Sequence, residues 1–336
     1  MTARALLEVS DLQTSFTLGG RSPIVAVDGV GFTVDRGETL AIVGESGSGK
    51  SVTALSIMRL LPARVGHITG GRIQLAGREL TDLPETDMRS VRGKEIGMIF
   101  QEPMTSLNPV HSVGAQIAEV LVEHEALSAS DARARAIEML DTVGIPEPAR
   151  RVDSYPHEMS GGMRQRAMIA MALACRPSLL IADEPTTALD VTIQAQILDL
   201  MEDLQERLGM AIIFITHDLG VVAQMARRVV VMYAGQIVES GPVEEIFQRP
   251  RMPYTAGLIG SIPRLGDTDR GQRLRTIPGN VPSLAELGGG CRFSSRCRHA
   301  ESACAAGTPP LERVTDGHEV RCLRWRELDL TEEVAR

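Results

Sequence analysis

The most informative segment of the sequence is Gly44-Glu45-Ser46-Gly47-Ser48-Gly49-Lys50-Ser51. It fits the pattern G-x-x-x-x-G-K-[S/T] and follows the short apolar run Leu40–Val43, which predicts a buried strand. The residues after it are expected to open a helix. Such a turn predicts a phosphate-binding loop, because its backbone N–H groups face an anion and the helix N-terminus adds partial positive charge. Residues 44–51 are called the phosphate loop below.

The phosphate loop predicts a division of roles among its residues. Lys50 is expected to neutralise charge on the β- and γ-phosphates of a nucleotide, and Ser51 to give a hydroxyl ligand to Mg²⁺. The alternative is a glycine-rich turn that matches the pattern by chance. The predicted nucleotide-binding residues of the loop are Gly44, Ser46, Gly47, Ser48, Gly49, Lys50 and Ser51.

Apolar runs and helical patterns alternate along the chain. Three further runs without polar alternation suit strands that are buried on both faces of a parallel sheet. These runs are Ile96–Phe100, Leu179–Ala182 and Ala211–Ile215. Residues 191–208 repeat apolar side chains at helical spacing, with Asp190 as a candidate N-cap and Gly209 as a stop signal. This alternation predicts an α/β core, which the phosphate loop makes an α/β fold of the P-loop NTPase type.

Other segments predict structures other than buried parallel strands. Residues 6–34 and 72–80 are typical of β-hairpins, and residues 131–142 of an amphipathic helix. After about Arg249, prolines interrupt regular patterns; they are Pro250, Pro253, Pro263, Pro278 and Pro282. The sequence therefore predicts a domain over residues 1–249 and a smaller, loop-rich C-terminal extension over residues 250–336.

Two acids follow the run that ends at Ala182. Open parallel sheets bind ligands at the carboxyl ends of their strands. Asp183 is therefore expected to hold Mg²⁺, through water, and Glu184 to polarise an attacking water. The alternative is a pair of solvated acids that favour the dipole of a following helix.

Composition excludes several classes of protein. The 336 residues are 43% hydrophobic and 23% charged, which argues against disorder over most of the chain. A net charge of −8 argues against general nucleic-acid binding. The longest apolar run, Ala167–Ala182, is broken by Arg176, so no membrane span is expected. Glu8 interrupts the apolar N-terminal segment, so we expect no signal peptide and a reducing compartment.

Four of the five cysteines lie near the end of the chain: Cys291, Cys297, Cys304 and Cys322. Gaps of five, six and seventeen residues separate them, wider than the short knuckles of most structural zinc sites. A [4Fe–4S] cluster tolerates longer gaps, yet the spacing departs from common ferredoxin patterns too. Spacing alone leaves zinc, a cluster and free thiols open. Cys175 is expected to be a small buried hydrophobe.

The segment Met159–Arg166 resembles the signature motif of ABC (ATP-binding-cassette) ATPases. Ser160 is a good N-cap, and Gly161 and Gly162 let backbone N–H groups approach an anion. The resemblance implies that this helix end faces the γ-phosphate of ATP held by a partner subunit. Met159 and Met163 depart from the commonest pattern, so we assign Met163 no phosphate contact.

Four more positions resemble ABC motifs in chain order. Gln101 is similar to the glutamine that contacts Mg²⁺ and the attacking water. Ala188–Asp190 resembles the loop that links the two sites of a dimer, and His217 the switch histidine that contacts the γ-phosphate. Phe16 lies where the family places an aromatic that stacks on adenine, although such a ring is often core. The resemblance implies an antiparallel β subdomain and a helical subdomain at about residues 102–175.

Two segments narrow the resemblance. One is residues 101–109, which are similar to a segment of the ATPase subunits of dipeptide and oligopeptide importers. The other is residues 277–284 with the cysteines, which is similar to the C-terminal extension of the same subunits. That group is known to carry a [4Fe–4S] cluster, which implies cluster ligands at the four cysteines. The implied function is ATP hydrolysis that energises peptide uptake. Alternatives are uptake of nickel, glutathione or another small solute, and a soluble non-transport ABC ATPase.

The resemblance also implies partners and roles. A second ABC ATPase subunit (a related paralogue), two membrane permeases and an extracytoplasmic substrate-binding protein are expected, with no nucleic acid. The chain would lie peripherally on the cytoplasmic face of the cell membrane. ATP and Mg²⁺ are the expected substrate and cofactor. The implied catalytic residues are Lys50, Gln101, Glu184 and His217; Ser160, Gly161, Gly162 and Asp190 contact nucleotide; Ser51, Gln101 and Asp183 serve Mg²⁺.

Overall fold

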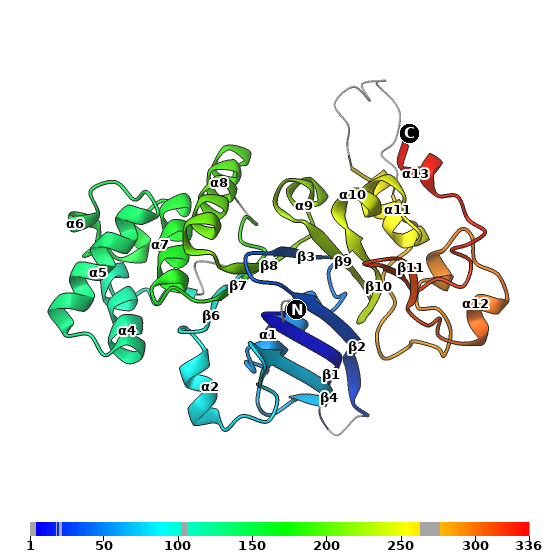
Figure 1. The fold of residues 1–336 in the computed structure, drawn as a ribbon, viewed down its shortest axis with the longest axis horizontal. Coiled ribbons are helices and arrows are strands. Elements are labelled where there is room, and N and C mark those ends of the chain that lie inside the picture. Colours follow the sequence, from blue (N-terminus) through cyan, green and yellow to red (C-terminus); the bar gives the residue numbers. More distant parts are fainter. Residues whose placement is uncertain are drawn as a thin grey trace. The chain divides into compact units, whose positions relative to one another are not determined.

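The computed structural model describes residues 5–17, 19, 22–101, 106–187, 189–262 and 276–335 (Figure 1). The chain separates into two compact units, each assembled from distant pieces of sequence. The first unit holds the start of the chain, Val34–Thr39 and Leu75–Ile215; the second holds Glu8–Thr33, Leu40–Gln74 and Thr216–Arg336.

A parallel sheet forms the centre of the first unit. Its strands are β6 (Ile96–Ile99), β7 (Leu179–Asp183) and β8 (Ala211–Thr216). Strand β7 pairs with β6 on one side and with β8 on the other, both in parallel. Every residue of the three strands is buried. The predicted strands are confirmed, because unbroken apolar runs suit a sheet that is covered on both faces.

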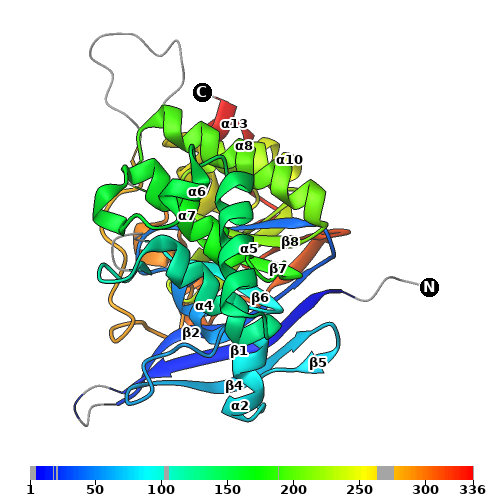
Figure 2. The same ribbon diagram turned by 90° about the vertical axis from the view of Figure 1, so that its left-hand side faces the viewer.

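Helices make up the rest of the first unit, beside the two-residue strand β5 (Arg78–Glu79). They are α2 (Glu85–Val91), α4 (Val113–Glu125), α5 (Ala129–Thr142), α6 (Pro148–Arg151), η1 (Pro156–Glu158), α7 (Gly161–Leu173) and α8 (Val191–Leu208). Helices α4, α5 and α7 pack against one another (Figure 2). Helix α8 has the bounds that its apolar spacing predicts, with the Asp190 carboxylate accepting from the Ile193 N–H at 3.0 Å. Among the described residues, no helix combines the length and apolar character that crossing a membrane requires.

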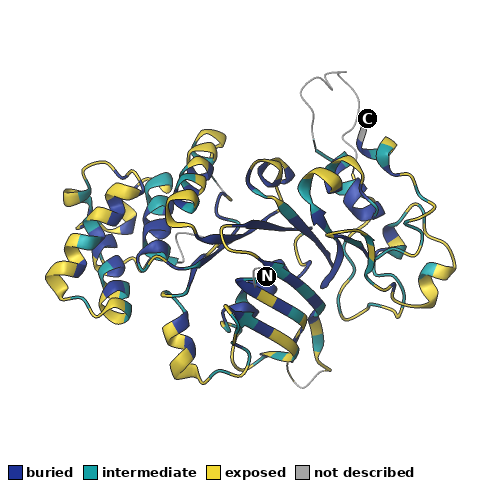
Figure 3. Ribbon diagram, viewed as in Figure 1, coloured by how far each residue is buried: buried dark blue, intermediate teal, exposed yellow. Residues whose placement is uncertain are grey.

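The second unit contains a half-exposed sheet with the order β2 (Ile24–Val34), β1 (Leu7–Phe16), β4 (Gly66–Leu75). Buried and exposed residues alternate along β1, as Figure 3 shows. This pattern is typical of a sheet with one face toward the core. The hairpin expected over residues 6–34 is present as the neighbours β1 and β2.

A further set of paired strands in this unit carries the phosphate loop at one strand end. Strand β3 (Thr39–Val43) pairs in parallel with β9 (Arg228–Tyr233), which pairs antiparallel with β10 (Gln236–Pro242). Two strands of the C-terminal extension, β12 (His318–Val320) and β11 (Glu312–Thr315), continue this sheet beyond β10. The helices of this unit are α1 (Lys50–Ile57), α9 (Leu219–Met225), α10 (Val243–Gln248), α11 (Pro253–Gly260), η2 (Ser294–Arg296), α12 (Ala303–Ala306) and α13 (Thr331–Ala335).

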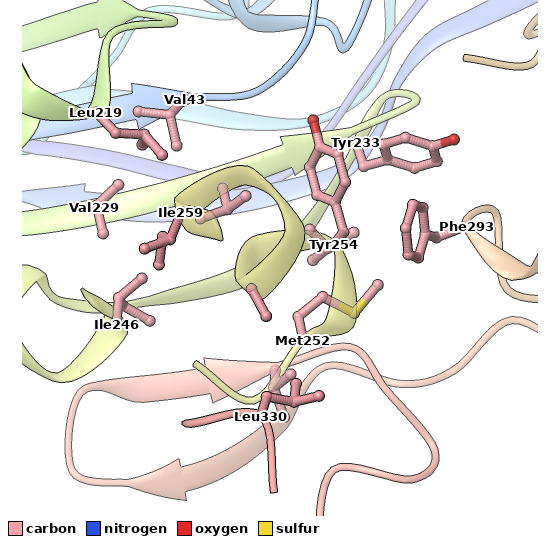
Figure 4. Close-up of a cluster of buried hydrophobic side chains, with 14 of the residues drawn as sticks. Val43, Leu219, Val229, Tyr233, Ile246, Met252, Tyr254, Ile259, Phe293 and Leu330 are labelled. Carbon is pink, nitrogen blue, oxygen red and sulfur yellow. The ribbon is translucent and has the colours of Figure 1, made fainter. Parts of the chain in front are cut away.

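The extension shares one hydrophobic core with the strands beside the phosphate loop. Val43 and Val229 of the sheet belong to the same buried cluster as Tyr254, Phe293 and Leu330 (Figure 4). The extension is thus more regular than its prolines suggest. Pro253, which we expected to interrupt structure, begins α11, since a proline at the first helical position lacks only an N–H that has no partner there.

A buried polar cluster also joins the extension to β10. The Nε2 atom of His318 lies 3.0 Å from the Glu239 carboxylate, and both side chains are almost fully buried. The same carboxylate accepts backbone N–H groups from Arg251 and Met252. A buried carboxylate requires such partners, and nothing in the local sequence pattern predicted them.

Candidate active site

The backbone of the phosphate loop requires glycine at two positions. Gly44 has φ 148°, and a Cβ there would lie 2.1 Å from the carbonyl oxygen of Met232. Gly49 has φ 101°, and a Cβ there would lie 2.9 Å from the carbonyl oxygen of Ala26. Side chains are therefore excluded where the loop leaves β3 and where it enters α1. These contacts give a physical reason for both glycines of the motif.

Lys50 folds back over the loop that precedes it. It is the first residue of α1, and its Nζ donates to the carbonyl oxygens of Gly44 at 2.7 Å and Glu45 at 3.1 Å. The side chain is buried, whereas Ser46 and Gly47 at the tip of the loop are exposed. Ser51 follows at the second position of α1 and is half-buried. The loop thus presents an ammonium group and a helix N-terminus to the same place, which suits a polyphosphate.

The predicted acids lie at the carboxyl end of β7. Asp183 is the buried last residue of the strand, and Glu184 follows it, half-buried, with φ 48°. The positive φ turns Glu184 out of the strand, while its N–H still donates to the Ile215 carbonyl at 2.9 Å. Non-glycine residues with such backbone angles gather at functional sites.

The structure brings Gln101 and Glu184 together. The Nε2 atom of Gln101 donates to Glu184 Oε2 at 3.1 Å, and the Thr187 hydroxyl donates to the same oxygen at 2.9 Å. Two donors fix the carboxylate, which leaves it oriented to accept a proton from a water. This geometry suits a general base. The contact between Thr187 and Glu184 was not expected from the sequence.

The signature segment forms the exposed N-terminus of α7. The Ser160 hydroxyl accepts from the Met163 N–H, as predicted, and Ser160 and Gly161 are exposed. Gly162 is half-buried, and a Cβ there would lie 3.0 Å from Ile193 of α8. Arg164 donates to the Met159 carbonyl at 2.8 Å and so fixes the turn before the helix. The helix end is therefore open for an anion.

A second contact of α7 was missed by the sequence analysis. The Nε2 atom of Gln165, which is buried, donates to the Pro185 carbonyl at 2.5 Å. Pro185 directly follows Glu184, so the signature helix and the end of β7 are joined by a hydrogen bond. Gln165 is flanked by Arg164 and Arg166, and nothing in this local pattern predicts its contact with Pro185.

The remaining predicted residues are placed as follows. Asp190 is exposed at the N-cap of α8, and His217 is exposed after β8, next to the Asp218 cap of α9. Phe16 is half-buried at the end of β1, with its ring against Gly66. Their contacts with nucleotide stay predictions. Residues 102–105 and Ala188 lie outside the described residues.

The four C-terminal cysteines line one small pocket. All four are half-buried and unpaired by disulfides. Burial raises the pKa of Cys291 and Cys297, and raises that of Cys322 to about 11, with smaller contributions from neighbouring thiols. In the part of the chain that the structure describes, no group of three or more His, Cys, Asp or Glu side chains is placed to hold a metal ion. We call this cavity the thiol pocket.

Cys175 is half-buried rather than fully buried. Its Sγ lies 3.9 Å from the Val120 carbonyl oxygen, and burial raises its pKa to about 11. The thiol is therefore neutral near pH 7 and packs as a small hydrophobe.

Comparison with known proteins agrees with this geometry. Residues 27–187 match the family model described as ABC transporter, and residues 238–304 match the oligopeptide/dipeptide transporter C-terminal region. The chain is 58% identical to the peptide import ATP-binding protein BMEII0863 of Brucella melitensis, over 98% of this chain and 99% of that protein. It is 57% identical to the oligopeptide transport ATP-binding protein OppD of Bacillus subtilis, over 94% and 88%.

Solved structures place the fold in the same family. The ATP-binding cassette MJ0796, a dimer in a post-hydrolysis state bound to ADP and Pi, is 28% identical, with a TM-score of 0.63 over 70% of this chain and 98% of that one. The resemblance drawn from the motifs and the α/β P-loop fold are both confirmed. The chain belongs to the ABC transporter family, as an ATPase subunit of the group that carries the oligopeptide/dipeptide transporter C-terminal region.

Proposed function

We propose that this chain hydrolyses ATP to energise the uptake of di- or oligopeptides through a membrane importer. The observation that carries the ATPase mechanism is the Glu184 carboxylate, held by Gln101 and Thr187 at the end of a buried strand. The match of residues 238–304 to the oligopeptide/dipeptide transporter region favours peptides over nickel, glutathione or another small solute.

The residues suggest how hydrolysis proceeds. The phosphate loop binds the ATP phosphates, with Lys50 balancing their charge, and Phe16 stacks on the adenine. Ser51, Gln101 and Asp183 would hold Mg²⁺, which would supply positive charge to the phosphates. Glu184 accepts a proton from the water that attacks the γ-phosphate in line, and His217 contacts that phosphate. Catalysis then rests on positioning and charge stabilisation.

Transport requires partners that carry the membrane spans. Two ATPase subunits bind ATP head to tail, with Ser160–Gly162 of one subunit facing the phosphate loop of the other and Asp190 in the loop between the sites. The partner subunit is a related paralogue. Two permeases convert closure of the dimer into alternating access on the cytoplasmic face of the membrane. An extracytoplasmic binding protein selects the peptide.

We propose a [4Fe–4S] cluster, rather than zinc, for the thiol pocket. Four thiolates around one zinc ion would have to lie about 3.8 Å apart, given Zn–S bonds of about 2.3 Å in a tetrahedron. The described residues offer no such tight group, yet all four thiols face one cavity. A larger cluster spans wider thiols. Cys291, Cys297, Cys304 and Cys322 would each ligate one iron, and the cluster would serve a structural role.

Iron content tests the cluster. Protein purified without oxygen should show broad absorption near 400 nm and about four irons per chain. Replacing Cys304 by Ser should remove both signals, whereas Cys175→Ser should leave them unchanged, because Cys175 lies outside the pocket. One zinc per chain and no iron would instead identify a zinc site.

Affinity purification and uptake test the transport function. Tagged chain from detergent-solubilised membranes of its own host should bring down two multispan proteins and a second ABC ATPase. Deletion of its gene should abolish uptake of a labelled tripeptide and leave nickel and glutathione uptake intact. Loss of nickel or glutathione uptake alone would change the substrate, and the lack of any membrane partner would favour a soluble ABC ATPase.

A further inference from the structure

The guanidinium group of Arg296 reaches from the C-terminal extension to the phosphate loop. Its two terminal nitrogens donate to both carboxylate oxygens of Glu45, at 2.6 and 2.9 Å. The Arg296 side chain is only 4% exposed, and that of Glu45 29%. A two-pronged arginine–carboxylate pair fixes both direction and distance, and burial shields it from salt.

Arg296 makes two further hydrogen bonds. Its Nε donates to the Pro278 carbonyl at 2.9 Å, and one terminal nitrogen contacts the Tyr233 hydroxyl at 3.4 Å. The hydrogen bonds to Glu45 raise the pKa of Arg296, so the side chain stays charged. Arg296 is therefore also held by groups outside the loop, one in the extension and one in β9, and its position does not depend on Glu45 alone.

The loop is held at Glu45 by its backbone as well. The Glu45 N–H donates to the Tyr254 hydroxyl at 2.9 Å. Tyr254 packs against Tyr233 and Phe293, with ring centroids 4.7 and 5.3 Å away (Figure 4). The Glu45 carbonyl accepts from Lys50 at 3.1 Å, so the residue that Arg296 fixes is also a residue that orients the loop lysine.

Arg296 itself lies in a short turn between two thiols of the pocket. The turn runs from Cys291 to Cys297, with the Ser294 N–H donating to the Cys291 carbonyl and the Cys297 N–H to the Ser294 carbonyl. Both thiols face the thiol pocket. One hydrogen-bonded turn therefore contacts the pocket at its ends and the phosphate loop through its arginine.

We propose that Arg296 is a positioning residue for the phosphate loop, and that through it the occupant of the thiol pocket sets the affinity for nucleotide. The second part rests on the proposed cluster. Cys291 and Cys297 would hold the cluster at the two ends of the turn, and the turn would then hold the guanidinium that orients Glu45. Coupling of this kind is reciprocal, so bound nucleotide also stabilises the pocket.

Steady-state ATP hydrolysis tests the role of Arg296. Arg296→Lys keeps the charge and loses the two-pronged geometry, and Glu45→Gln keeps the shape and loses the charge. Each should raise KM for ATP about five- to tenfold and leave kcat within about twofold, because the loop binds less well but the Glu184 machinery is untouched. The KM of the double variant should be no higher than that of the more impaired single variant, because both changes remove the same interaction.

Arg321→Lys is the matched control. Arg321 directly precedes Cys322 and donates to the carbonyls of Ile237 and Pro309, so the control alters a half-buried arginine of the extension whose side chain bonds to residues outside the loop. It should keep the wild-type KM. An unchanged KM in Arg296→Lys and Glu45→Gln, or effects that multiply in the double variant, would overturn the positioning role.

Nucleotide affinity with and without iron tests the coupling. Binding of a fluorescent ATP analogue should weaken at least about threefold when a chelator strips iron from the wild-type protein. In the Glu45→Gln, Arg296→Lys double variant the same treatment should change affinity less than about 1.5-fold. Equal changes in both proteins, or none in the wild type, would exclude this route. If the protein purifies without iron, the claim that the occupant of the thiol pocket sets nucleotide affinity is overturned. The KM values still decide whether Arg296 positions the loop.

Discussion

Replacing Glu184 by Gln should lower ATP turnover at least about a hundredfold while ATP still binds. The carboxylate is placed to accept a proton from water, and an amide cannot take that role. The amide oxygen can still accept the hydrogen bonds that Gln101 and Thr187 donate to Glu184. The local structure is therefore retained, and the loss appears in kcat rather than in nucleotide affinity.

Two measurements separate this expectation from a folding defect. Hydrolysis should be compared with equilibrium binding of a fluorescent ATP analogue, and the variant should accumulate as a closed dimer with ATP bound. Glu202→Gln changes an exposed acid of α8 and should behave as wild type. Hydrolysis at the wild-type rate in Glu184→Gln would remove Glu184 from the role of general base.

Those parts of the site that depend on local sequence were predictable. The phosphate loop needs glycines because a Cβ at residue 44 or 49 would collide with backbone, and that demand is visible in the motif itself. Helix α8 was predicted to the residue, since Asp190 and Gly209 provide its cap and its stop. Apolar runs identified β6, β7 and β8 because both faces of that sheet are buried.

Contacts between distant segments were not predictable from pattern. Arg296 and Glu45 are separated by 251 positions, and no periodic pattern or motif in the sequence links the two residues. The same holds for the buried pair of His318 and Glu239. The extension was read as loop-rich because prolines do not distinguish a helix start such as Pro253 from a break. Its β11 and β12 are too short to show a period.

Replacing Lys50 by Ala should weaken ATP binding at least about a hundredfold, which corresponds to roughly 3 kcal/mol from lost charge-assisted contacts. The ammonium group lies over the loop, where it is bonded to the Gly44 and Glu45 carbonyls. Lys50 is the positively charged side chain of the predicted phosphate site. Alanine also removes the link between α1 and the first turn of the loop. Titration with a fluorescent ATP analogue measures the change directly.

The sequence supplies its own control for Lys50. The chain has only two lysines, and the second, Lys94, is exposed with its Nζ on the His124 carbonyl. Lys94→Ala removes an equal charge and should leave affinity unchanged, so a loss in both variants would point to net charge instead of the loop.

The two large effects also differ in kind. Lys50→Ala weakens binding before any chemistry, whereas Glu184→Gln binds ATP and fails to cleave it, so a Lys50→Ala protein with normal affinity and reduced kcat would contradict the role of Lys50.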